Sequence, residues 1–433
     1  MNQQSTKACV LSVLYSGLGQ IYNGQYAKGI LFALLQTVFI FLMLPYVTNS
    51  LLGLFTLGDT PQRIVGGKIV HGDHSIFMMI YGIIALLVLL MFLALYVFNI
   101  IDANKTGKMK DQGKPITDFS TSIKNLLEKG FPYALLSPAV LFTIFLTVTP
   151  LLFGILIAFT NYSAPHHLPP RSLVDWVGFR NFIDLIEIPF LRGTFVGVAL
   201  WTFVWAIVAT VTTFFGGLIV AVVINRHGIK LKRFWRTIYV LPWAMPGFIS
   251  ILIMRNMFNA QFGPINEYIE FIGLSGIPWF AEVGWARVTA IIVNLWMGFP
   301  YFMAMMSGVL AGISKDLYEA ADIDGANPRQ QFWKITVPLV LYMTAPLMIM
   351  GFAFNFNNFA LIYLLSGGGP AVPGYFYAGG TDILISWIFK LTLEQSQFHL
   401  ASAVSIIIFI FIAGISIYNF KNTRSFKEEG MIQ

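Results

Sequence analysis

Charged residues are scarce in this sequence. Asp, Glu, Lys and Arg make up 11% of its 433 residues, and hydrophobic residues make up 57%, whereas soluble proteins carry roughly 25% charged residues. This composition excludes an ordinary soluble domain and predicts a protein that uses the bilayer as its solvent. The single cysteine, Cys9, excludes an internal disulfide, and no Cys/His cluster has the spacing of a zinc site.

Eight stretches are long and apolar enough to cross a bilayer, which requires about 20 mainly apolar residues. They cover residues 30–55, 76–101, 134–159, 196–224, 237–254, 290–310, 337–365 and 400–418. An earlier stretch, from Cys9 to Tyr22, is shorter and contains Gly17 and Gly19, so we interpret it as interfacial or re-entrant. We therefore predict an all-α polytopic membrane protein with about eight transmembrane helices.

Basic residues lie mainly in alternate connecting segments. If the N-terminus is cytoplasmic, the inner segments hold 19 of the 27 Lys and Arg residues and the outer loops hold 6. Because basic residues accumulate on the cytoplasmic side, both termini are predicted to be cytoplasmic, and the net charge of +7 needs no nucleic acid to explain it. The basic connector 105–129 marks a boundary between an N-terminal region, 1–131, and a six-span region, 132–433.

Ionisable side chains are absent from the interiors of the predicted spans. Proton- or ion-coupled carriers place such groups near the bilayer midplane, so the pattern disfavours a secondary carrier, and it disfavours a polytopic enzyme for the same reason. The sequence also lacks a phosphate loop with the Gly-Lys-Ser/Thr ending. Any ATP that drives this protein must therefore be hydrolysed by a different chain.

The segment between residues 310 and 338 is predicted to be cytoplasmic and to form two short helices. Ser314 is a suitable N-cap for the first helix, and Gly325 suits a left-handed stop at its end. Asn327 then caps a second helix, with Pro328 at its first position and Gln330 completing a capping box. On capping alone, a plain connector between two spans is the alternative.

The same segment resembles the EAA loop of permease subunits of binding-protein-dependent ABC importers. The matching residues are Glu319, Ala320, Ala321, Gly325, Ile335 and Pro338. The resemblance implies that Ser314 to Gly325 forms a coupling helix in a cleft of a separate ATPase. It implies coupling roles for Glu319, Ala320, Ala321, Asp324 and Gly325. It also implies that ATP and Mg²⁺ bind the ATPase, and that this chain itself holds no cofactor.

Two later spans carry polar and aromatic residues at spacings of i, i+4 and i+7, which place them on one helical face. The first stripe comprises Asn294, Gly298 and Tyr301, and the second comprises Gly351, Asn355 and Asn358. Trp296 lies off the first stripe, and a helix break between Gly298 and Pro300 would turn it inward. Uncharged amides and aromatic faces suit a hydroxyl-rich ligand such as a neutral sugar. Hydrogen bonds between helices and an interfacial aromatic belt are the alternative.

Four stretches, 294–301, 317–321, 352–359 and 378–384, are similar to the larger permease subunit of maltose and maltodextrin importers, and the similarity runs from about Pro132 to the C-terminus. It implies a bacterial cell-membrane permease with a six-helix core. The implied partners are a second homologous permease, a cytoplasmic ATPase dimer and an extracellular binding protein, and the implied cargo is an oligosaccharide of maltodextrin type. Another oligosaccharide or a polyol is the alternative.

This similarity also implies a sugar pocket. Its residues would be Trp243, Gly247, Asn294, Trp296, Gly298, Tyr301, Gly351, Asn355 and Asn358. Trp243 stands where the family usually has Tyr, and Gly247 and Gly351 stand where hydroxyl residues are usual, which would make the pocket larger. The short outer loop after the third span resembles the Gram-positive variant, whose binding protein is tethered by a lipid.

Overall fold

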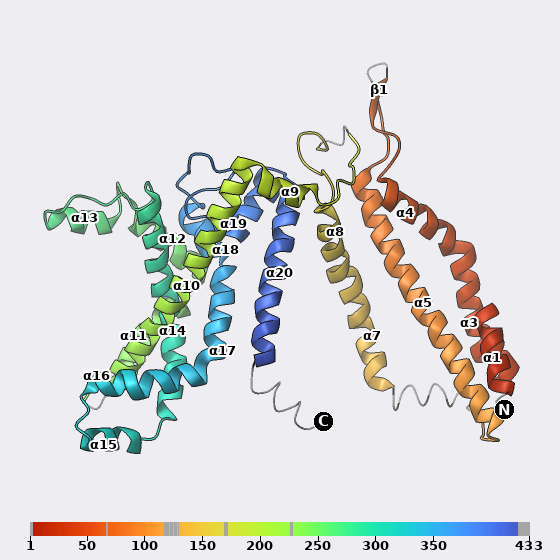
Figure 1. Ribbon diagram of the computed structural model, residues 1–433, viewed down its shortest axis with the longest axis horizontal. Coiled ribbons are helices and arrows are strands. Elements are labelled where there is room, and N and C mark those ends of the chain that lie inside the picture. Colours follow the sequence, from red (N-terminus) through yellow and green to blue (C-terminus); the bar gives the residue numbers. More distant parts are fainter. Residues whose placement is uncertain are drawn as a thin grey trace. The chain divides into compact units, whose positions relative to one another are not determined.

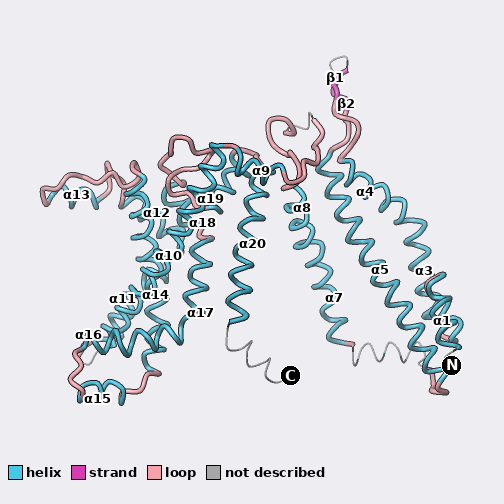
Figure 2. Tube along the Cα trace, in the orientation of Figure 1, coloured by secondary structure: helices cyan, strands magenta, loops and turns pink. Residues whose placement is uncertain are grey.

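The computed structural model describes residues 3–65, 68–116, 121, 124, 128, 130–168, 172–225 and 228–422. Helices dominate these residues (Figure 2), so the predicted all-α class is confirmed. The chain forms two compact units, residues 1–178 and residues 179–433, and each is described by itself. The boundary predicted between residues 131 and 132 lies inside the first unit and stays a prediction.

The first unit consists of helices and one β-hairpin (Figure 1). Three of its long helices are candidate membrane spans, and the first and third of these contain a π-helical turn of five residues. The elements are α1 (Gln3–Leu14), α2 (Leu18–Asn23), α3 (Tyr26–Val38), η1 (Phe39–Met43), α4 (Leu44–Thr56), β1 (Arg63–Val65), β2 (Lys68–Val70), α5 (Ser75–Asp111), α7 (Phe131–Thr143), η2 (Ile144–Val148) and α8 (Thr149–Ile157).

The segment Cys9 to Tyr22 contributes to α1 and α2, which pack against α5. Gly17 joins the two helices in the left-handed region, with φ of 90°, a conformation that glycine adopts without steric cost. Gln20 of the segment donates to Asp102 of α5 at 3.1 Å, and Lys28 of the following helix α3 forms an ion pair with the same carboxylate at 2.6 Å. Whether this segment lies at the membrane interface stays a prediction.

The second unit is built around long helices, of which α10 has 37 residues and α14 has 29. Its elements are α9 (Arg180–Glu187), α10 (Pro189–Asn225), α11 (Lys232–Ala244), α12 (Gly247–Met257), α13 (Pro264–Phe271), α14 (Val283–Ala311), α15 (Asp316–Ile323), α16 (Pro328–Gln331), η3 (Phe332–Thr336), α17 (Val337–Phe356), α18 (Phe359–Ser366), α19 (Leu384–Phe389), η4 (Lys390–Glu394) and α20 (Phe398–Asn422). Within this unit, α15 and α16 lie at one end, and α12, α13 and the loop before α19 lie at the other (Figure 1).

Seven helices among the described residues are long and apolar enough to span a membrane, and α11 with α12 would form an eighth. By the length and composition of the helices, the prediction of about eight spans is therefore confirmed. The predicted continuous helix over 237–254 is wrong, because α11 and α12 are bent by 92°. Pro246 cannot donate a backbone hydrogen bond and forces the preceding Met245 into an extended conformation. The predicted span 337–365 is likewise interrupted, at Asn357 and Asn358 between α17 and α18.

The core of the second unit is the contact between α10 and α14, which α17 extends on one side. Trp205, Phe214 and Met306 are fully buried there. Glycines permit the close approach: a Cβ atom at Gly298 would lie 2.7 Å from the Thr213 methyl group. The packing of α14 and α17 against α10 holds the candidate residues of α14 and α17 in fixed positions.

Candidate functional site

Helix α15 presents an exposed surface at one end of the second unit. Glu319 and Ala320 are exposed, and Ala321 is half-buried. Glu319 makes no ion pair with any described residue, and its position in the first turn favours its charge through the helix dipole. Ile323, which the sequence analysis did not single out, is 87% exposed. A charged, small and apolar surface of this kind can enter a groove on another protein.

The end of α15 follows the sequence prediction, but its beginning does not. Gly325 has φ of 75°, and Asp324 is the C-cap. The N-cap is Lys315 and not Ser314, although the Ser314 hydroxyl accepts a hydrogen bond from the Asp316 amide at 3.3 Å. The two positions differ by one residue, because Lys315 already has helical backbone angles while the Ser314 hydroxyl still accepts from an amide of the first turn.

The second short helix begins as predicted. Asn327 is its N-cap, Pro328 occupies the first position, and Gln330 completes the capping box with hydrogen bonds of 2.9 Å in both directions. A π-helical turn, η3, follows at once and leads into α17. The hydroxyl of Thr336 in η3 lies 2.9 Å from the hydroxyl of Tyr318 on α15. The exposed helix α15 is therefore linked to the turn that leads into α17.

The candidate sugar residues lie on α11, α12, α14 and α17 and at the start of α18, and each of the other elements packs against α14. The side-chain amide of Asn358 donates to the side-chain oxygen Oδ1 of Asn294 at 3.4 Å, which joins the start of α18 to α14. Asn358 also caps α18 by accepting from the Leu361 amide. The structure thus brings one residue of each predicted stripe together.

Asn355 is buried, and its side chain already forms hydrogen bonds with other residues of the chain. Its amide donates to the Thr210 hydroxyl at 3.0 Å and to the Gly351 carbonyl oxygen at 3.1 Å, while its own backbone oxygen accepts from Trp205. A Cβ atom at Gly351 would lie 3.3 Å from Thr210 and 3.4 Å from Phe302. These contacts match the alternative of hydrogen bonding between helices, and they place Gly351 against helix α10.

Two aromatic candidates remain accessible. Trp243 on α11 is 61% exposed and Tyr301 on α14 is 40% exposed, with ring centroids 6.3 Å apart. Gly247 begins α12 immediately beyond the bend, and a Cβ atom there would lie 3.5 Å from the Met297 methyl group. Rings exposed side by side offer apolar faces of the kind that a pyranose ring contacts.

The helix break that would turn Trp296 inward does not occur. Helix α14 continues through Pro300 from Val283 to Ala311, and membrane helices tolerate such prolines because neighbouring groups satisfy the freed carbonyl. Trp296 is half-buried and stays off the stripe that contains Asn294, Gly298 and Tyr301. The structure therefore gives no additional support for a sugar-binding role of Trp296.

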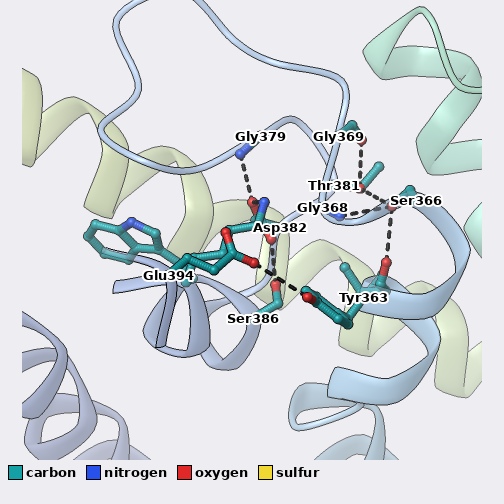
Figure 3. A network of polar contacts seen from close by, with 12 residues as sticks. Tyr363, Ser366, Gly368, Gly369, Gly379, Thr381, Asp382, Ser386 and Glu394 are labelled. Carbon is teal, nitrogen blue, oxygen red and sulfur yellow. Dashed lines mark hydrogen bonds and ion pairs between the residues drawn. The ribbon is translucent and has the colours of Figure 1, made fainter. Parts of the chain in front are cut away.

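A polar network that the sequence analysis missed holds the loop between α18 and α19 (Figure 3). The carboxylate of Asp382 is fully buried and accepts from the Gly379 amide at 2.7 Å, from Ser386 at 2.8 Å and from Lys390 at 2.6 Å. Burial raises the pKa of this carboxyl, while the nearby ammonium of Lys390 opposes the rise. The signal in the sequence was an acidic residue within an otherwise apolar stretch.

The network continues to the end of α18 and to α14. The hydroxyls of Ser366 and Thr381 lie 2.7 Å apart, and Thr381 also donates to the Gly369 carbonyl at 2.7 Å. Arg287 of α14 donates to the Gly380 carbonyl at 2.8 Å and stacks over the Trp201 ring at 4.2 Å. The loop is therefore fastened from several sides.

No group of three His, Cys, Asp or Glu side chains is arranged to hold a metal ion anywhere in the part of the chain that the structure describes. The buried carboxylate of Asp382 is paired with an ammonium group and not with further carboxylates. The chemistry available at the candidate sites is binding through amides, aromatic rings and exposed helix surfaces.

Comparison with known proteins gives the family. Residues 213–424 match the family described as binding-protein-dependent transport system inner membrane component. A galactooligosaccharide transport permease of Bacillus subtilis is 41% identical over 428 residues, covering 99% of this chain and all of the relative. A maltodextrin transport permease of the same organism is 41% identical over 441 residues, covering 99% of this chain and 98% of the relative.

A solved structure shows the same fold. It is a bacterial ABC transporter involved in the import of the acidic polysaccharide alginate, with 21% sequence identity and a TM-score of 0.55 over 68% of this chain and 95% of the matched chain. Together with the membrane-spanning helices and the exposed α15, these relationships show that the chain belongs to the family of binding-protein-dependent inner membrane components and is a multi-pass permease subunit of an ABC sugar importer.

Proposed function

We propose that this permease moves maltodextrin-type oligosaccharides into the cell by alternating access. The accessible pair Trp243 and Tyr301 carries the proposal, together with the amide pair Asn294 and Asn358, because Tyr301 and Asn294 lie on the same helix, α14. Aromatic faces and uncharged amides contact the two kinds of surface that a neutral sugar presents. The relative from Bacillus subtilis that is named for maltodextrin transport supports the same cargo.

The proposed partners follow from the exposed α15 and from the family. A second, homologous permease completes the transport pathway, and a cytoplasmic ATPase dimer receives α15 in a cleft. The ATPase binds ATP and Mg²⁺, and Glu319 and Ile323 contact it. An extracellular binding protein, tethered by a lipid, delivers the sugar. Both termini are then cytoplasmic, in agreement with the distribution of Lys and Arg in the sequence.

A galactooligosaccharide cargo is the second candidate. The relative named for galactooligosaccharide transport matches this chain at the same 41% identity as the one named for maltodextrin. Position 243 carries Trp, and positions 247 and 351 carry Gly, which fits a pocket with fewer hydroxyl contacts. The two cargoes differ in linkage and in the orientation of a hydroxyl group, and a site with few hydrogen bonds separates such isomers poorly.

Reconstitution tests the cargo and the energy source together. The complete complex in proteoliposomes should take up labelled maltotriose with ATP inside, and unlabelled maltodextrins should compete better than galacto- or isomalto-oligosaccharides. Better competition by galactooligosaccharides would favour the second candidate. Uptake by the permease pair without the ATPase would contradict the proposed coupling.

The coupling surface is tested with Gly325→Asp. Nothing lies within 4 Å of a Cβ atom at Gly325, so the change adds a side chain in open space at a residue with positive φ. Gly228 is a matched control, since it also has positive φ and open surroundings but lies outside the coupling segment. We expect Gly325→Asp to abolish ATP-driven uptake and Gly228→Asp to keep it. Equal uptake by both variants would contradict the coupling role.

A further inference from the structure

The second unit contains a cavity at the end opposite to α15. Its volume is about 460 Å³, which lies within the range of about 300–1,000 Å³ that small-molecule sites occupy. The walls come from the last turns of α12 and α18 and from the segment before α14, and they include Arg255, Asn256, Asn259, Phe280 and Ser366. These residues are distinct from the sugar residues that the sequence analysis identified.

The polar groups of this cavity retain unused hydrogen-bonding capacity. Arg255 has no carboxylate partner among the described residues and makes one long hydrogen bond, of 3.5 Å, to the Leu364 carbonyl. The side chain of Asn256 is exposed, and the amide oxygen of Asn259 accepts from two backbone amides, which leaves its NH₂ group to donate. Guanidinium and carboxamide groups next to the ring of Phe280 match a ligand that carries hydroxyls on an apolar frame.

The cavity wall is held in place by the network described above. The hydroxyl of Ser366 lies 2.7 Å from that of Thr381 and accepts from the Gly368 amide at 3.2 Å. The same loop is fixed by the buried carboxylate of Asp382 (Figure 3). A wall that is already ordered loses little conformational freedom when a ligand binds.

Two packed helices connect the cavity with the candidate sugar residues. Helix α12 begins at Gly247 and reaches the cavity at Arg255 and Asn256, while α18 begins after Asn358 and reaches it at Ser366. The two helices pack against each other and are about 12 to 16 Å long. A short oligosaccharide can span such a length with one end ring in each place.

We propose that the cavity is an outer subsite that binds the terminal ring of an oligosaccharide while the rest of the sugar extends toward Trp243, Tyr301 and Asn358. The proposal rests on the proposed function. It makes the transporter sensitive to chain length, because a disaccharide reaches only one of the two places at a time. Arg255 and Asn256 donate to ring hydroxyls, and Phe280 contacts the apolar face of the ring.

The test compares two chain lengths in proteoliposomes that contain the complete complex and its binding protein. Maltose and maltopentaose are the probes, and galactobiose and galactotetraose replace them if wild type transports that series. Asn256→Phe fills the cavity, and Arg255→Gln removes its charge without filling it. Ile253→Phe is the control, because this residue lies on the same helix, is 47% exposed and does not line the cavity.

We expect Asn256→Phe to raise KM for the longer sugar about tenfold and KM for the disaccharide less than twofold, with Arg255→Gln causing a smaller change of the same kind and Ile253→Phe none. Equal changes for both chain lengths, or weaker docking of the binding protein, would show that the cavity residues contact the binding protein and not the sugar. Either result would overturn the proposal. Unchanged KM values in both cavity variants would also overturn it. If wild type transports neither series, the proposed function itself fails.

Discussion

The hydroxyl groups of Tyr318 and Thr336 lie 2.9 Å apart and join α15 to η3, the π-helical turn that leads into α17. A second hydrogen bond joins the same region to α15, because Gln331 of α16 donates to the carboxylate of Asp322 on α15. Helix α15 is thus attached at two points to α16 and η3, which lead without a break into α17. A displacement of α15 by a partner would be passed to the helix that carries Asn355.

We predict that Tyr318→Phe lowers the number of sugar molecules transported per ATP hydrolysed. The change keeps the ring and removes one hydrogen bond, which contributes about 0.5–1.5 kcal/mol, so the ratio should fall about two- to tenfold. Uptake and ATP hydrolysis measured in the same proteoliposomes give this ratio. Tyr268→Phe is the control, since the Tyr268 side chain is 73% exposed on α13. A normal ratio in Tyr318→Phe would show that the link is dispensable.

The coupling segment shows how far the sequence could predict local structure. Gly325 and the capping box of Asn327 and Gln330 were correctly predicted, because each depends on residues at most three positions apart. The link from Tyr318 to Thr336 was not predicted, since it joins two elements across a turn and depends on their packing. The bend at Pro246 was also missed, because a proline in an apolar stretch is compatible with a continuous membrane helix.

The sequence predicted which residues of the candidate sugar site share a helical face, but it did not predict which residues contact one another. Spacing placed Asn294 and Asn358 on two helical stripes, but Asn358 lies beyond the end of α17 as the N-cap of α18. The structure nevertheless brings the two side-chain amides together. Spacing could not reveal that Asn355 bonds to Thr210, because Thr210 lies on a different helix. The buried pair of Asp382 and Lys390 was missed for the same reason: its burial depends on several elements that meet around one loop.

We predict that Trp243→Ala raises KM for the transported sugar about three- to tenfold and leaves the maximal rate nearly unchanged. An aromatic contact contributes about 0.5–1.5 kcal/mol beyond its buried area, and the exposed Trp243 ring is available for it. Uptake at saturating ATP gives both constants. Trp235→Ala, which removes another exposed tryptophan of α11, should leave KM unaltered. A lower maximal rate at constant KM would argue against a binding role for Trp243.

The ion pair of Asp382 and Lys390 predicts a large loss of stability on removal of one partner. Asp382→Asn leaves the ammonium of Lys390, only 14% exposed, without its carboxylate, and breaking a buried pair costs about 3–5 kcal/mol. The double variant Asp382→Asn with Lys390→Met should be less destabilised than the single variant. Thermal unfolding of the purified chain in detergent measures both. A double variant as unstable as Asp382→Asn would mean that the hydrogen bonds, and not the charges, stabilise the loop.

Asp73 predicts a local dependence on pH in the first unit. Its carboxylate accepts hydrogen bonds from the Asp59 amide, the Thr60 amide and the Thr60 hydroxyl, and these bonds lower the pKa of the Asp73 carboxyl. Because the folded-state pKa lies below the unfolded value of about 3.9, the stabilisation is present above that pH and is lost as the pH falls through the folded-state value. The loop should therefore be anchored at neutral pH and loosen in acid.

Hydrogen exchange at the Asp59 and Thr60 amides checks this expectation. After correction for the intrinsic exchange rate, their protection should be constant from pH 7 to about 5 and fall below about pH 4, the range in which an aspartate with a lowered pKa becomes protonated. Asp73→Asn keeps an acceptor oxygen but does not titrate, so its protection should be lower at neutral pH and independent of acid. A parallel loss of protection in both proteins would mean that a different group responds to acid, because the two chains differ only in whether residue 73 can be protonated.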